Sequence, residues 1–139
     1  MLWMTKKIDY AFLALHVLLN RDDDSVLRVT EISKVWSVPQ KFLSKIMKDL
    51  VDAGIVKSKY GPGGGYVMSQ KPAEVTFRRV IEAVEGPIYL LKCIKEDSGC
   101  AHYDKCPQID AWSDLQKDLV KLLESKTLEA LVDAPVPTS

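Results

Sequence analysis

Three cysteines are the side chains with the richest chemistry in this chain of 139 residues, and all of them fall within residues 93–106. They are Cys93, Cys100 and Cys106, and the residues between them are small, polar and charged, which predicts a loop rather than a core segment. Such a loop has little apolar surface, so a buried, inert thiol fits it poorly. An odd number of cysteines without a secretory signal argues against a disulfide framework.

Three thiolates that close on one point indicate a metal centre. The gaps of six and five residues between them are longer than the short gaps of zinc ribbons. Wider loops suit a larger group such as an iron–sulfur cluster, which cysteine thiolates hold. Structural zinc and free thiols stay open as alternatives. A set of four ligands needs one more side chain from elsewhere.

Composition indicates one soluble domain. The hydrophobic content of 47% and the charged content of 27% are ordinary for a globular protein, and no apolar run approaches the roughly 20 residues of a membrane span. The first residues lack the apolar core of a signal peptide, so we expect a cytoplasmic protein with reduced cysteines. No nucleophile stands beside an evident base, so an enzyme is not expected.

The net charge is zero, but the charges are unevenly placed. Residues 1–82 carry 13 Lys and Arg against 9 Asp and Glu, whereas residues 83–139 carry 6 against 10. A basic front and an acidic back indicate an anionic partner at the front.

A helix-turn-helix pattern follows in this basic part. The first helix is expected from Val29 or Thr30 to Trp36, with a turn at Ser37-Val38. Pro39 suits the start of the second helix, which is expected to run from Gln40 to about Ala53 and to stop at Gly54. The expected core face of the second helix is Phe42, Leu43, Ile46 and Leu50.

Another face of this second helix is polar and has the character of a recognition helix in the major groove of DNA. Lysines on such a helix meet phosphates, while uncharged polar side chains reach base edges. The predicted DNA contacts of this face are Gln40, Lys41, Ser44, Lys45 and Lys48.

Two short strands around a glycine-rich turn, over residues 55–60 and 66–69, predict a hairpin, which after a helix-turn-helix is the wing of a winged helix. A phosphate-binding P-loop is not expected, because no Lys-Ser/Thr pair follows the glycines. The predicted DNA contacts of the wing are Lys57, Lys59, Tyr60, Gly63 and Gly64.

Helices are also expected outside this motif. Thr5 can cap a first helix that runs to about Asn20, and another helix begins at Thr76 and ends at Gly86. The longest helix runs from Pro107 to about Ser125, and its narrow apolar seam predicts packing on its twin in a homodimer. The seam consists of Trp112, Leu115, Leu119 and Leu122.

The fold class expected from these elements is mainly α with a small β-hairpin wing. Residues 1–86 are expected to form the winged helix-turn-helix domain and residues 87–106 the cluster-binding loop. Residues 107–132 are expected to form the dimerisation helix and a terminal turn, and residues 133–139 a flexible tail.

The combination of Tyr60-Gly-Pro-Gly-Gly-Gly-Tyr66, three cysteines and a long helix with Trp112 resembles the Rrf family of iron–sulfur transcription regulators. The resemblance covers roughly residues 4–132. It implies a homodimer that binds double-stranded DNA under the control of a cluster, with Cys93, Cys100 and Cys106 as cluster ligands.

The resemblance also bears on the fourth ligand. IscR-like members use a histidine three residues after the last cysteine, where this chain has Ile109, whereas NsrR-like members use an aspartate of the partner subunit near the start of the first helix. Asp9 falls on that position, and His102 inside the loop is its rival. Without the resemblance, the helix dipole alone accounts for Asp9 in a first turn.

The resemblance is therefore closer to NsrR-like members. It implies a repressor that senses nitric oxide or oxidants through a [4Fe–4S] cluster. A [2Fe–2S] sensor of redox or iron status, and a cluster-free or zinc-stabilised DNA-binding dimer, are the alternatives.

Overall fold

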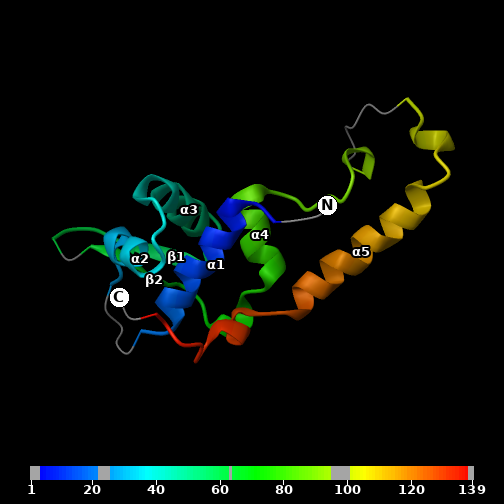
Figure 1. The fold of residues 1–139 in the computed structure, drawn as a ribbon. Coiled ribbons are helices and arrows are strands. Elements are labelled where there is room, and N and C mark those ends of the chain that lie inside the picture. Colours follow the sequence, from blue (N-terminus) through cyan, green and yellow to red (C-terminus); the bar gives the residue numbers. More distant parts are fainter. Residues whose placement is uncertain (1–3, 22–25, 63, 95–100, 138–139) are drawn as a thin grey trace.

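The computed structural model describes residues 4–21, 26–62, 64–94 and 101–137. This part of the chain is mainly helical, with one small antiparallel hairpin and a long C-terminal helix (Figure 1), which confirms the expected fold class. The helices and strands are α1 (Lys6–Leu19), α2 (Val29–Trp36), α3 (Gln40–Asp52), β1 (Val56–Lys59), β2 (Gly65–Met68), α4 (Phe77–Glu85) and α5 (Ile109–Ser125). Short 3-10 turns lie at Pro72–Glu74, Lys92–Ile94, Tyr103–Lys105 and Leu128–Leu131.

Helices α1 to α4 surround the apolar core (Figure 1). Helix α1 packs against α3 and α4, and α2 packs against α3. Their apolar side chains repeat at helical spacing, so each helix turns one face inward. The largest fully buried side chains of these helices are Leu15, Ile32, Leu43, Ile46, Met47, Leu50 and Val80.

Phe42 is a correction to the expected core. Its side chain is 55% exposed, whereas Met47 is fully buried on the same helix. The buried stripe of α3 is centred between Leu43 and Met47, and Phe42 lies at the edge of that stripe, beside α1. There its ring meets Tyr10 edge-on, with the centroids 6.3 Å apart.

The ends of the helices follow capping chemistry. The hydroxyl of Thr5 accepts the N–H of Ile8 at 3.4 Å and begins α1, as expected. Helix α3 begins at Gln40, directly after Pro39, as expected, whereas the expected start of α5 at Pro107 is wrong because α5 begins at Ile109. The first helical bonds run from Leu43 to the carbonyl of Pro39 and from Trp112 to that of Gln108.

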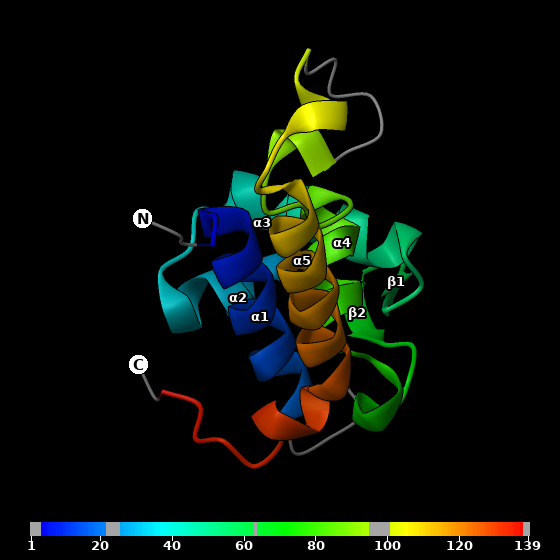
Figure 2. The same cartoon turned by 90° about the vertical axis from the view of Figure 1, so that its right-hand side faces the viewer.

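Helix α5 extends away from the body of the molecule, and the turns Lys92–Ile94 and Tyr103–Lys105 lie at its N-terminal end in both views (Figures 1 and 2). No residue of α5 is fully buried. Near its C-terminal end, Glu124 pairs with Arg78 of α4, which also pairs with Glu82 at 3.1 Å. The hydrogen bond to Glu82 raises the pKa of Arg78, and the hydrogen bond to Glu124 raises it further. The guanidinium that joins α4 to α5 therefore stays charged. Across the described ranges, no helix is long and apolar enough to cross a membrane.

Candidate DNA-binding surface and cysteine site

The predicted DNA contacts of α3 all lie on its exposed face. Lys45 forms an ion pair with Asp49 at 3.0 Å, and Lys48 forms one with Asp52 at 3.4 Å. Exposed pairs of this kind contribute about 0.3–0.5 kcal/mol each, so the lysines can exchange these partners for phosphates. The face therefore presents Gln40, Lys41, Ser44, Lys45 and Lys48 to solvent.

The wing is an antiparallel hairpin whose last pair is Lys59 with Gly65. The side chain of Tyr60 is 94% exposed, and Lys57 and Lys59 are also exposed. Gly64 has a structural role, because a Cβ there would lie 2.6 Å from the carbonyl oxygen of Lys59. Gly63 lies outside the described residues.

Arg28 joins the wing to the helix-turn-helix, and sequence reasoning missed it. It precedes α2, and its guanidinium donates a hydrogen bond to the carbonyl oxygen of Pro62 in the turn of the wing. Beside it, Leu27 exchanges two backbone hydrogen bonds with Tyr66 of β2, at 2.9 and 2.8 Å. A backbone carbonyl leaves no signal in the sequence, so nothing there pointed to Arg28.

Cys93 and Cys106 bracket the cysteine loop as half-buried, free thiols. Cys93 lies in the 3-10 turn Lys92–Ile94, and Cys106 follows the turn Tyr103–Lys105. Cys100 lies outside the described residues, and His102 is exposed. Among the residues that the structure describes, no three His, Cys, Asp or Glu side chains are close enough to hold a metal ion.

The donor chemistry of this loop still fits an iron–sulfur cluster. Two thiols free of disulfide bonds stand at the ends of a loop whose sequence supplies a third, and thiolates are the ligands that such clusters take. A fourth ligand is still needed, either His102 within the loop or a side chain from elsewhere.

Gln116 of α5 holds the chain that leads into this loop. Its Oε1 accepts the backbone N–H of Leu90 at 2.7 Å, and its Nε2 donates to the carbonyl oxygen of Ile88. Leu90 lies three residues before Cys93. This contact has no signature in the sequence, because both partners of Gln116 are backbone groups.

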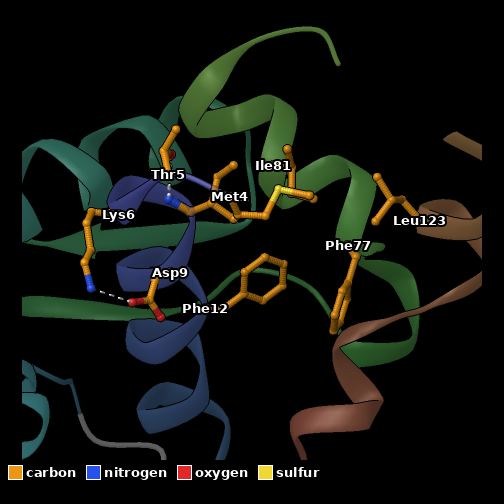
Figure 3. A pocket seen from close by; sticks show the side chains of 9 residues that line it. Met4, Thr5, Lys6, Asp9, Phe12, Phe77, Ile81 and Leu123 are labelled. Carbon is orange, nitrogen blue, oxygen red and sulfur yellow. Dashed lines mark hydrogen bonds and ion pairs between the residues drawn. The ribbon is translucent and has the colours of Figure 1, made fainter. Parts of the chain in front are cut away.

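Asp9 lies on α1 at the rim of an apolar groove of about 660 Å³. Its side chain is 50% exposed and pairs with Lys6 at 3.6 Å. Figure 3 shows this pair at one edge of the groove, with the apolar side chains beyond it. The apolar lining consists of Met4, Ile8, Phe12, Phe77, Ile81 and Leu123.

The start of α1 is tied to the end of α4. The hydroxyl of Thr5 donates to Glu85 at 2.7 Å, and the ammonium of Lys7 donates to the carbonyl oxygen of Val84 at 3.2 Å. Asp9 thus lies on a helix end that is fixed to α4, the last helix before the cysteine loop.

The apolar seam of α5 is open to solvent in a single chain. Leu115 is 51% exposed and Leu122 is 64% exposed, and together with Leu90, Trp112 and Leu119 they line a shallow groove of about 350 Å³. A contiguous exposed apolar strip of this kind marks an interaction surface.

A winged helix with a basic recognition helix defines the class of DNA-binding transcription regulators. The chain belongs to the Rrf2 family, whose model is described as an iron-dependent transcriptional regulator and matches residues 4–134. It is therefore a member of a family of transcription regulators and not of enzymes.

A relative agrees with this assignment, and solved structures share the fold. The HTH-type transcriptional regulator IscR of Klebsiella pneumoniae (strain 342) is 32% identical over 131 residues, which cover 94% of this chain and 79% of that protein. The structure of CymR, the global cysteine regulator of B. subtilis, is similar with a TM-score of 0.73 at 24% identity, covering 94% and 96% of the two chains. The IscR structure of T. potens has a TM-score of 0.73 at 21% identity, covering 99% and 94%.

Proposed function

We propose that this protein is a homodimeric repressor that senses nitric oxide or oxidants through a [4Fe–4S] cluster, closer to NsrR-like than to IscR-like regulators. The observation that carries the proposal is the place of the cysteine loop. The turns Lys92–Ile94, which holds Cys93, and Tyr103–Lys105, which precedes Cys106, lie at the N-terminal end of α5, away from the helices that surround the core (Figure 2). A site in this place is open to a second subunit.

The homodimer is supported by the exposed seam of α5. Two copies that pack these seams together bury Leu115, Leu119 and Leu122 and present two recognition helices to a two-fold symmetric site. DNA binding by two copies of α3 and the wing then follows the symmetry of the dimer.

The cluster ligands in this proposal are Cys93, Cys100, Cys106 and the partner subunit's Asp9. When bound, the cluster supplies iron that reacts with nitric oxide and oxidants. The proposal assigns three thiolates to one chain and a single carboxylate to the other, so Asp9 is the ligand that differs in chemistry. His102, exposed within the loop, is the rival to Asp9.

Asp9 also lies on a path to the DNA-binding surface. It belongs to α1, which packs directly against α3. A change in what Asp9 binds is therefore expected to displace α1 and, with it, the recognition helix. A coupling of roughly 1–3 kcal/mol between the two sites changes DNA affinity by about 5- to 150-fold.

The test compares Asp9→Ala with Lys6→Ala in protein purified without oxygen. Both variants remove the ion pair between Lys6 and Asp9, but only Asp9→Ala removes the carboxylate. We expect an altered or labile visible spectrum and a changed nitric-oxide response of DNA binding in Asp9→Ala, with Lys6→Ala like the wild type. Spectra and responses that match the wild type in Asp9→Ala would remove Asp9 from the mechanism and leave His102 as its rival.

A cluster-free or zinc-stabilised DNA-binding dimer is the second candidate. The observations that favour it are the winged helix and the exposed seam of α5, which account for DNA binding and pairing without a cluster. Iron, sulfide and zinc analysis of the same preparation separates the two candidates, and resolved visible bands of a [2Fe–2S] cluster identify a redox or iron-status sensor instead.

A further inference from the structure

We propose that Arg28 is a positioning residue that fixes the tip of the wing relative to the recognition helix, so that Lys59 and Tyr60 meet DNA together with α3. The proposal rests on DNA binding by the winged helix and is independent of the metal chemistry. Arg28 is exposed and lies outside both the recognition helix and the wing.

The base of the wing is already attached to the helix-turn-helix. Leu27 and Tyr66 form a two-bond antiparallel bridge, so the residue before Arg28 acts as a short third strand. The approach is close, because a Cβ on Gly65 would lie 2.6 Å from the carbonyl oxygen of Leu27. This bridge fixes β2 but does not reach the tip.

The tip extends beyond the last strand pair, Lys59 with Gly65. Within the described part of the tip, one backbone hydrogen bond closes the turn, from Gly64 to Gly61 at 2.9 Å. The bond from the Arg28 guanidinium to the carbonyl oxygen of Pro62 connects this turn to the start of α2. A charged donor makes a stronger bond than a neutral one.

Arg28 is itself held in place by the start of α2. Its backbone N–H donates to the carboxylate of Glu31 at 3.4 Å, and Glu31 pairs with Arg21 at 3.0 Å. Helix α2 packs against α3. The chain of contacts therefore runs from the recognition helix through α2 and Arg28 to the tip of the wing.

A direct bond from Arg28 to a DNA phosphate is the competing explanation for any loss of affinity. The two differ in what happens when the wing contact is already absent. A positioning residue acts through Lys59 and loses its effect in a Lys59→Ala background, whereas an independent phosphate contact keeps its full effect there.

The experiment is a double-mutant cycle on one DNA duplex that carries a site the wild type binds, measured at several salt concentrations. Arg28→Ala, Lys59→Ala and the double variant are compared, with Lys34→Ala on α2 as a control that removes the same charge from an exposed position. We expect Arg28→Ala to weaken binding by about threefold to tenfold, the range of one or two phosphate contacts. The double variant is expected to bind as Lys59→Ala does, because Arg28 has no further effect once the Lys59 contact is gone, and Lys34→Ala is expected to have a smaller effect.

Hydrogen exchange without DNA gives a second readout, which a phosphate contact would not change. The amide of Gly64 is expected to exchange faster in Arg28→Ala and at the wild-type rate in Lys34→Ala. Arg28→Gln, which keeps part of the aliphatic stem but is too short to replace the guanidinium, is expected to behave like Arg28→Ala.

Additive losses in the cycle, with unchanged exchange at Gly64, would overturn the positioning role of Arg28 while leaving DNA binding intact. A wild-type protein that binds no DNA duplex would instead contradict the proposed function itself. The two failures are therefore distinct.

Discussion

The side chain of Gln116 accepts the backbone N–H of Leu90 at 2.7 Å. Its amide nitrogen donates to the carbonyl of Ile88, so one side chain holds both backbone groups. Cys93 follows three residues after Leu90, and α5 begins three residues after Cys106. Gln116 thus connects the segment before the cysteine loop to α5, the helix that follows the loop.

Replacing Gln116 tests whether this tie matters for the cysteine site. Gln116→Leu removes both hydrogen bonds, so we expect the visible absorption of anaerobic protein to fade faster in the presence of a chelator. Gln116→Glu keeps an acceptor for Leu90 and is expected to be intermediate. In metal-free protein, the amide of Leu90 is expected to exchange faster in Gln116→Leu.

Gln108→Leu is the matched control for that prediction. Gln108 precedes the same helix and bonds to the indole of Trp112 at 3.1 Å, not to the segment before Cys93. Equal fading of absorption in Gln108→Leu and Gln116→Leu would show that the tie has no specific role.

The seam of α5 is expected to hold the dimer together. Leu119→Glu places a charge in the middle of the seam. Burial of a leucine contributes about 1.5–3 kcal/mol, and a two-fold symmetric interface contains the substituted residue twice. We expect a wild-type dimer and a monomeric variant by sedimentation at micromolar concentration. Lys117→Glu, at an exposed position of the same helix, is expected to stay dimeric. A wild-type monomer would contradict the dimer.

Arg79 is expected to stabilise the fold. Its guanidinium donates to the carbonyl of Ala53 at 2.7 Å and to the side chain of Gln70, joining α4 to the end of α3. A hydrogen bond to a charged group contributes about 1.5–3 kcal/mol, so Arg79→Met, which removes two of them, is expected to lower the free energy of unfolding in urea by at least about that amount. Arg78→Met, which breaks more exposed ion pairs, should cost less. Equal losses in both variants would remove this distinction.

Lys41 is expected to contact a phosphate. Each lost phosphate contact makes the fall of log K with log salt shallower by about 0.9. In a dimer, Lys41→Ala removes two contacts and is expected to reduce the steepness by about twice that value. Lys121→Ala, on α5, is the control and should leave the slope unchanged. A slope for Lys41→Ala equal to that of the wild type would take Lys41 out of the interface.

The positions of the helices along the chain were predictable, because the start and the end of a helix depend on local signals. The caps at Thr5 and Thr76, the end of α3 near Gly54 and the glycines of the wing all act over a few residues. Phe42 was assigned wrongly because periodicity cannot tell the centre of a buried stripe from its edge. That distinction depends on where α1 packs.

Contacts between distant backbone groups and single side chains could not be predicted in the same way. Arg28 reaches Pro62 and Gln116 reaches Leu90 only after the chain has folded, and neither pair has a characteristic spacing. The role proposed for Asp9 cannot be predicted from residue spacing either, because its proposed partner is the cysteine loop of another subunit.

The visible absorption spectrum of protein purified without oxygen, recorded during titration with nitric oxide and alongside DNA binding, is the most direct test. We predict a broad band that fades stepwise, with DNA released over the same range of nitric oxide. A colourless, zinc-containing protein that binds DNA equally well with and without nitric oxide would contradict the proposed function.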